Sequence, residues 1–137
     1  MKGFRSSSTR LHVRPGDLDS LGHVNNARAL EYLEQGRWDW LRHNGLALKC
    51  AILPVVVRVE ADYQGQLLWG EVEVETALHE DSAETFRATF TQSVRQAGSA
   101  RIAVRATVRL AFIDAASGQL CPVEDYLAAA SPQAFAP

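Results

Sequence analysis

The sequence lacks the features that mark several classes of protein. No apolar run approaches the roughly 20 residues of a membrane helix, and residues 1–10, MKGFRSSSTR, have no apolar centre like that of a secretory signal. The formal net charge is only -2, and the basic residues are dispersed along the chain. We therefore expect a soluble cytoplasmic protein that binds neither nucleic acid nor membrane.

Metal-binding and disulfide patterns are also missing. The 2 cysteines, Cys50 and Cys121, lie far apart and form no C-x-x-C pair. The histidines show no metal-ligand spacing, so we expect no metal site. A length of 137 residues without repeats or a low-complexity linker predicts one domain over residues 1–137.

What the sequence does contain is alternation typical of half-buried strands. Apolar and polar residues alternate in five segments, and turn residues separate them. In residues 54–63, PVVVRVEADY, alternation places Val55, Val57 and Val59 on one face and Arg58 and Glu60 on the other. The predicted strands are residues 9–14, 54–63, 71–76, 85–90 and 101–112.

One long helix is predicted over residues 25–43. Its apolar residues fall mostly three or four positions apart, which indicates a single stripe facing the sheet. Asn25 or Asn26 can cap its start, and Asn44-Gly45 supplies its stop. A second short helix is expected after Pro122, over residues 123–130. The stripe consists of Ala27, Leu30, Leu33, Trp38 and Leu41.

The order of elements predicts an α+β domain in which one helix covers an antiparallel sheet. A single helix covers only one face of the sheet, so the other face and an edge remain available. These features favour a dimer over a monomer.

The loop and helix start resemble a known family. The residues are Arg14, Asp19, residues 22–28 (GHVNNAR), residues 32–34 (YLE) and residues 37–39 (RWD). This segment, with the order of elements, is similar to the hot-dog fold, a curved antiparallel sheet of about five strands wrapped around one long central helix. It most resembles the 4-hydroxybenzoyl-CoA thioesterase-like branch, and within it bacterial long-chain acyl-CoA thioesterases.

The resemblance implies an acyl-CoA thioesterase that releases a medium- or long-chain fatty acid and coenzyme A. It implies no cofactor, because coenzyme A is part of the substrate. A homodimer or a dimer of dimers would carry the site at a subunit interface. Two other functions stay open: a hot-dog hydratase or dehydratase, and a non-catalytic acyl-CoA-binding module.

The resemblance assigns the catalytic carboxylate to Asp19 and the oxyanion donor to the backbone amide of Asn26. A helix start leaves amides unpaired and carries partial positive charge, which suits an oxyanion. Asp19 either attacks the thioester or orients a water molecule. The alternative for Asp19 is an ordinary turn aspartate, and we expect Asp17 to be structural.

His23 and Glu34 are supporting candidates for the catalytic site. His23 either orients Asp19 and lines the thioester slot or is a structural donor. Glu34 lies in the helical row of the apolar stripe, so we expect its carboxylate beside the sheet with a partner such as Arg37. It is either a second catalytic carboxylate or half of a salt bridge.

The substrate-binding residues are expected on both sides of the subunit interface. Gly22, Val24 and Asn25 belong to the loop and helix start, while the segment from Val56 through Val57 to Arg58 of the partner subunit would complete the pocket. The chain also departs from close relatives, which often carry an aromatic residue where Ala29 stands. That departure either widens the acyl pocket or repacks the core.

Overall fold

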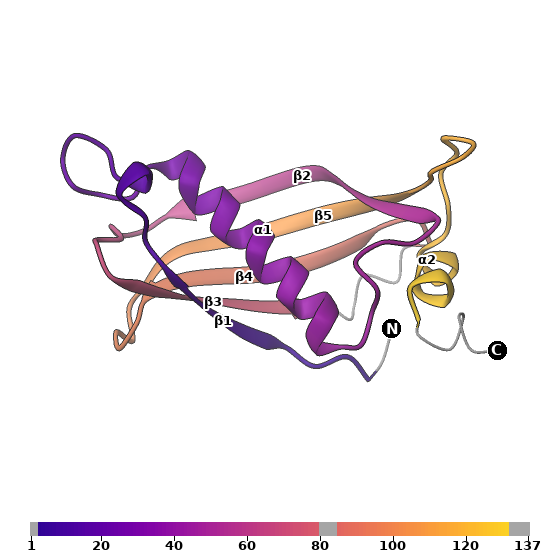
Figure 1. Ribbon diagram of the computed structural model, residues 1–137, viewed down its shortest axis with the longest axis horizontal. Helices are drawn as coiled ribbons and strands as arrows, with labels where there is room; N and C mark the ends of the chain where they lie inside the picture. Colours follow the sequence, from indigo (N-terminus) through magenta and orange to yellow (C-terminus); the bar gives the residue numbers. More distant parts are fainter. Residues whose placement is uncertain (1–2, 80–84, 132–137) are drawn as a thin grey trace.

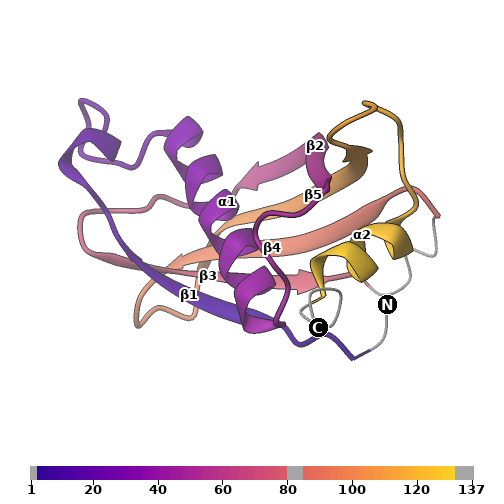
Figure 2. The same ribbon diagram turned by 45° about the vertical axis from the view of Figure 1, so that its right-hand side comes forward.

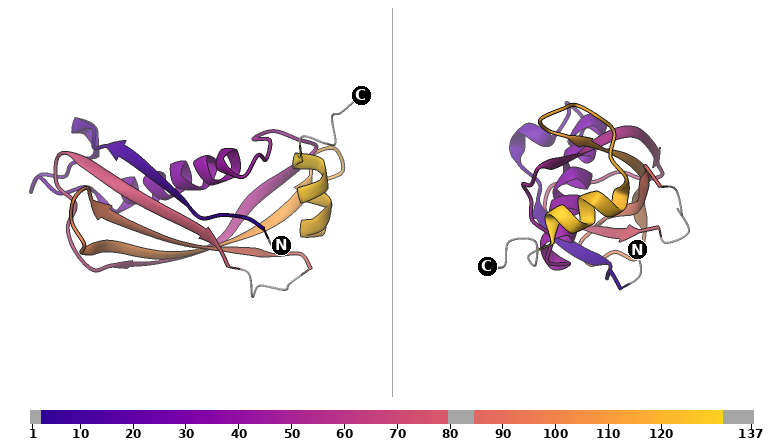
Figure 3. Two further views of the ribbon diagram at one scale, coloured as in Figure 1. Left: turned by 90° about the horizontal axis from the view of Figure 1, so that it is seen from below. Right: turned by 90° about the vertical axis from the view of Figure 1, so that its right-hand side faces the viewer.

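The computed structural model describes residues 3–79 and 85–131, and it has the predicted α+β architecture. A curved five-stranded antiparallel sheet wraps one face of the long helix α1, and the short helix α2 lies at one end of the sheet (Figures 1 and 3). The elements are β1 Ser7–His12, the 3-10 helix η1 Pro15–Asp17, α1 Asn26–His43, β2 Ile52–Tyr63, β3 Glu71–Leu78, β4 Ala88–Gln96, β5 Ile102–Asp114 and α2 Val123–Ala130.

The strand order in the sheet is β1-β3-β4-β5-β2, which leaves β1 and β2 at the two edges. Consecutive strands β3, β4 and β5 form the expected meander. Its register aligns Val74 with Val94 and Val94 with Val104, and all three valines are buried beneath α1. The predicted turn at residues 79–81 lies in part outside the described residues.

Two strand predictions were displaced along the chain. β1 begins at Ser7 and ends at His12, because the Val13 amide leaves the ladder and donates to the Gly70 carbonyl at 2.9 Å. The strand predicted over residues 85–90 instead runs from Ala88 to Gln96. Its apolar pattern is interrupted by an inward polar residue, Gln92, whose amide donates to the Leu33 carbonyl and the Thr76 hydroxyl, both at 2.9 Å.

The sequence predicted the wrong residues for each face of β2, and it predicted too much burial for the strand. Val56 pairs with Leu110 while Arg58 pairs with Arg109, so Val57 is the extra residue of a β-bulge. Because one extra residue exchanges the faces of a strand, Val55 and Val59 lie on opposite sides. Most of the strand is exposed, and four valines keep 41–50% of their surface accessible: Val55, Val56, Val57 and Val59.

Helix α1 begins and ends where the sequence predicts. The Asn25 side chain accepts a hydrogen bond from the Ala27 amide at 2.8 Å, which makes Asn25 the N-cap. Asn44 is the C-cap, and Gly45 follows with a φ of 71°, a conformation that favours glycine.

The buried face of α1 differs from the predicted stripe. Gly36 is buried against β3, where an added Cβ would lie 2.6 Å from Val74 Cγ1. Leu30 and Trp38 lie on another side of the helix and remain 37% and 48% exposed. The residues of α1 that are buried are Ala29, Tyr32, Leu33, Gly36 and Trp40.

The core has two clusters, one beneath the N-terminal half of α1 and one near its C-terminal end. Ala29 is buried in the first cluster, so its small side chain belongs to the core. In the second, the Trp40 ring packs edge-on against Phe90 at 4.9 Å, and Phe112 packs against Tyr126 of α2 at 4.7 Å. Helix α2, whose predicted bounds are confirmed, covers this end of the sheet (Figure 2).

Candidate active site

The loop before α1 is a small hairpin held at its base. Leu18 and Val24 form an isolated antiparallel bridge, and the Asp19 amide donates to the His23 carbonyl at 2.7 Å. Gly22 makes the turn with a φ of 81°. The buried Val24 donates from its amide to the Leu67 carbonyl at 2.8 Å, so the hairpin is fixed to the segment that leaves β2.

Asp17 is buried beneath this hairpin and has a structural role. Its side chain is 2% exposed and accepts hydrogen bonds from the Tyr32 hydroxyl at 2.6 Å and from the Arg14 backbone and guanidinium at 3.0 Å. Burial opposes ionisation, but these hydrogen bonds outweigh it and lower the pKa of Asp17. The carboxylate joins the loop to α1, which agrees with the structural interpretation from the sequence.

Asp19 lies at the surface of the hairpin with one oxygen committed to the loop. Its Oδ1 accepts the amide protons of His23 at 3.1 Å and Leu21 at 2.9 Å, while Oδ2 has no hydrogen-bond partner among the described residues. The His23 amide, followed by that of Leu21, lowers the pKa of Asp19. Asp19 is therefore ionised at neutral pH, with a free oxygen that can attack an electrophile or hold a water molecule.

The start of α1 leaves one amide unpaired. The Asn25 side chain accepts a hydrogen bond from the Ala27 amide. The Asn25 carbonyl accepts hydrogen bonds from the amides of Arg28 at 2.9 Å and Ala29 at 3.1 Å. Within the described part of the chain, no acceptor lies within hydrogen-bond distance of the Asn26 amide. Asn25 thus caps the helix, whereas the Asn26 amide remains a free hydrogen-bond donor at the positive end of the helix dipole.

Two further contacts define the surroundings of this amide. The Tyr63 hydroxyl donates to the Asn26 carbonyl at 3.2 Å, which ties the helix start to the end of β2. The His23 imidazole is half-buried and interacts electrostatically with Asp19. Asp19 and His23 therefore lie in the hairpin and Asn26 at the helix start that directly follows it, a segment that Gly22, Val24 and Asn25 shape.

Glu34 does not belong to this hairpin and helix start, but it does lie beside the sheet, where it lines a pocket together with residues of β2 and β4. It is exposed, and it lies eight residues after Asn26, or about 12 Å along the helix axis. Arg37, its predicted partner, instead donates to Gln92 Oε1 at 3.0 Å. Burial lowers the pKa of Arg37, and the negative charge of Glu34 partly offsets that effect.

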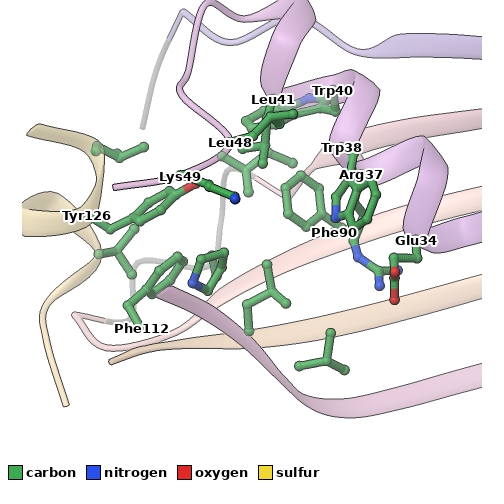
Figure 4. A pocket seen from close by; sticks show the side chains of 17 residues that line it. Glu34, Arg37, Trp38, Trp40, Leu41, Leu48, Lys49, Phe90, Phe112 and Tyr126 are labelled. Carbon is green, nitrogen blue, oxygen red and sulfur yellow. The ribbon is translucent and has the colours of Figure 1, made fainter. Parts of the chain in front are cut away.

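Sequence reasoning missed a pocket at the other end of α1. A cavity of about 430 Å³ lies between the C-terminal half of α1, the first half of β2 and helix α2 (Figure 4). Its walls are mainly apolar and include the rings of Trp38, Trp40, Phe90, Phe112 and Tyr126. The aromatic residues are dispersed in the sequence, and the row of Glu34, Trp38 and Leu41 on α1 was interpreted as a stripe that packs on the sheet, so the pocket was not predicted.

The residues of β2 that were predicted to bind substrate fall into two groups. Val56 lines this pocket together with Pro54, whereas Val57 and Arg58 do not line it. Val57 is the extra residue of the bulge, and the Arg58 guanidinium pairs with the Glu60 carboxylate. The bulge therefore places Val56, which faces the pocket, and Arg58 on opposite faces of β2.

Residues 3–79 and 85–131 contain neither a metal-binding cluster nor a membrane-spanning helix. No three side chains of His, Cys, Asp or Glu in this part of the chain gather closely enough to hold a metal ion. Nor does it include a helix that is both long and apolar enough to cross a membrane.

Known proteins resemble this chain in sequence and in fold. The long-chain acyl-CoA thioesterase FadM of Escherichia coli is 53% identical over 36 residues, which span 26% of this chain but only 27% of that enzyme. A candidate thioesterase from Pseudomonas aeruginosa superposes with a TM-score of 0.77 at 26% identity, covering 86% of this chain and 92% of its own.

The 1,4-dihydroxy-2-naphthoyl-CoA thioesterase from Synechocystis shares the fold, with a TM-score of 0.79 at 19% identity over 91% of this chain and 95% of that chain. The family model of the thioesterase-like superfamily matches residues 13–131. The predicted hot-dog fold is confirmed, and the predicted enzyme class, thioester hydrolase, agrees with the family. The chain belongs to the thioesterase-like superfamily.

Proposed function

We propose that the protein hydrolyses fatty acyl-CoA thioesters to a free acid and coenzyme A, without a cofactor. The observation that carries the proposal is the unpaired Asn26 amide at the start of α1, directly after the hairpin that carries the ionised Asp19. A thioester carbonyl needs a hydrogen-bond donor for its developing negative charge and a nucleophile at its carbon. The similarity of one segment to FadM supports a long acyl chain.

The reaction follows from these two groups. The thioester carbonyl oxygen accepts a hydrogen bond from the Asn26 amide while Asp19 Oδ2 attacks the carbonyl carbon. The C–S bond then breaks and releases the thiolate. Water then attacks the resulting anhydride, which frees the acid and restores Asp19. A thiol pKa of about 8.5 makes the thiolate a good leaving group. The lowered pKa keeps Asp19 ionised at neutral pH, so its carboxylate can attack without first losing a proton.

The proposed assembly is a homodimer, alone or as half of a dimer of dimers, formed by β2 against its copy. An unpaired edge strand with four exposed valines invites such pairing. The partner's Val56 would then line the substrate path, with Val57 and Arg58 at the contact between strands. Glu34 enters the proposal as a residue of the partner's pocket, beside Arg37. The predicted cytoplasmic location stays part of this proposal.

An acyl-CoA screen with thiol detection tests the activity, and Asp19→Asn tests the mechanism. We expect turnover to fall at least about a hundredfold in this variant with folding and acyl-CoA binding retained, on the scale of positioned catalytic groups. The matched control is Asp125→Asn, at an exposed aspartate in the first turn of α2, with turnover unchanged.

Three other results of these experiments would contradict the proposed activity or mechanism. Acyl-CoA binding without thiol release by the wild-type protein would indicate a binding module. Water added to or removed from the acyl chain, with the thioester intact, would indicate a hydratase or dehydratase. Unchanged turnover in Asp19→Asn would remove Asp19 from the mechanism.

A further inference from the structure

The apolar pocket at the C-terminal end of α1, which we name the α2 pocket, is separated from the candidate catalytic surface of its own chain. Glu34, the first residue of α1 to line the pocket, lies eight residues after Asn26, or about 12 Å along the helix axis. In Figure 1 the loop that carries Asp19 and helix α2 lie at opposite ends of the molecule. The pocket therefore does not adjoin the Asp19 surface in one chain.

The lining of the pocket suits a hydrocarbon chain. Figure 4 shows Glu34 and Arg37 side by side at one end and Lys49 entering from the loop before β2, with carbon atoms between them. Removing an apolar chain from water into such walls is favourable, and each buried methylene adds to affinity. The pocket thus has the chemistry to bind the acyl chain of a thioester.

Helix α2 forms a firm end wall. Val123, Tyr126 and Leu127 line the pocket from α2, and the first two are each 4% exposed. Tyr126 packs on Phe112, and burial raises the pKa of its hydroxyl to about 12, so the ring stays neutral. A chain that enters from the β2 side meets this wall, which would set the longest chain that fits.

Strand β2 relates this pocket to the active site of a second copy. The Tyr63–Asn26 hydrogen bond fixes the start of α1 at the C-terminal end of β2, while Pro54 and Val56 line the pocket in its first half. Two copies of β2 that pair antiparallel about a twofold axis bring the C-terminal end of one beside the first half of the other. This pairing would bring the start of α1 in each chain close to the partner's α2 pocket.

We propose that the acyl chain of a thioester held at Asp19 and Asn26 of one subunit occupies the α2 pocket of the partner subunit, where α2 limits its length. This inference rests on the proposed thioesterase function and dimer. It assigns chain-length selection to residues far from Asp19 in the sequence and in the single chain.

Two pocket variants of opposite effect test the length limit. Ala88→Leu fills the pocket from β4, and Leu127→Ala enlarges it at α2. We expect the ratio of kcat/KM for long-chain to short-chain acyl-CoA to fall at least about tenfold in the first and to rise in the second, because each buried methylene contributes severalfold to transition-state affinity. The controls Ala115→Leu and Leu120→Ala, at exposed positions outside the pocket, should leave the ratio unchanged.

Mixed dimers test which subunit supplies the pocket. Asp19→Asn and Ala88→Leu chains with different affinity tags are co-expressed, and dimers that carry both tags are isolated. If the chain crosses the interface, one of the two sites combines an intact Asp19 with an open partner pocket. We then expect about half of the wild-type long-chain activity, whereas a pocket used within one chain gives none above the parent variants.

These outcomes separate the two levels of inference. If the wild-type protein hydrolyses no acyl-CoA, the proposed function fails, and this inference fails with it. Hydrolysis with an unchanged length ratio in both pocket variants overturns the pocket alone. Mixed dimers without long-chain activity, or a failure to isolate any mixed dimer, overturn the use of the partner's pocket.

Discussion

The two ends of α1 are stabilised by different kinds of contact. At the N-terminal end, short polar side chains hold a hairpin through hydrogen bonds to backbone amides and to Tyr32. At the C-terminal end, Trp40, Phe90 and the aromatic side chains of the α2 region pack around an apolar cavity. Directional bonds can place a reacting carboxylate and an amide, while apolar packing selects a ligand by its shape. The first end is therefore suited to chemistry and the second to recognition.

Removing Trp40 gives the largest expected effect on stability. Trp40 is 2% exposed, and its ring centroid lies 4.9 Å from that of Phe90 and 5.3 Å from that of Phe4. We expect Trp40→Ala to lower the free energy of unfolding by about 4 kcal/mol, measured by urea denaturation. The control is Trp69→Ala, at a tryptophan with 54% of its surface exposed, and its cost should stay below about 1 kcal/mol. Equal costs would contradict the importance of apolar packing at this end.

Removing the charge of Asp17 tests the N-terminal end in the same way. Asp17→Asn keeps the shape but loses the charge that Arg14 and Tyr32 bind, so we expect a loss of about 3 kcal/mol at pH 7. The pKa of Asp17 is lowered below its ordinary 3.8 in the folded protein, so its contribution is complete above that pH and disappears as the pH falls further.

Urea unfolding of wild type and Asp17→Asn between pH 7 and pH 2.5 measures this dependence. The difference in unfolding free energy between the two proteins should be constant above about pH 5 and shrink below about pH 4. A difference that stays constant down to pH 2.5 would mean that the Asp17 charge does not stabilise the fold.

The comparison also explains what could be predicted from the sequence. The caps at both ends of α1 were predictable because caps depend on neighbours in the chain, as the Asn25 cap and the Asn44-Gly45 stop illustrate. The pocket was not, because it depends on contacts between distant segments. The Val57 bulge and the approach of Gly36 to Val74 each changed which face of an element is buried, and neither has a local signal.

Truncating the N-cap should affect activity more than stability. Asn25→Ala removes the bond to the Ala27 amide, which costs about 1 kcal/mol, and it loosens the turn that presents the Asn26 amide. We expect turnover to fall about tenfold. Asn44→Ala, which truncates the asparagine at the other end of α1 and its bond to the Trp40 carbonyl, is the matched control with a similar stability cost and unchanged turnover. Equal losses of turnover would refute a special role for the helix start.

The smallest effect is expected for Glu34→Gln, which asks whether the second half of α1 contributes chemistry. The Glu34 carboxylate is exposed and forms no ion pair with Arg37, so no contact fixes it at a reacting atom. We expect turnover to fall less than tenfold, with Glu31→Gln on the same helix as the control that leaves it unchanged. A loss as large as that of Asp19→Asn would instead make Glu34 a second catalytic carboxylate. Since Glu34 lies about 12 Å from Asn26 along its own helix, such a carboxylate would act on the substrate of the partner subunit.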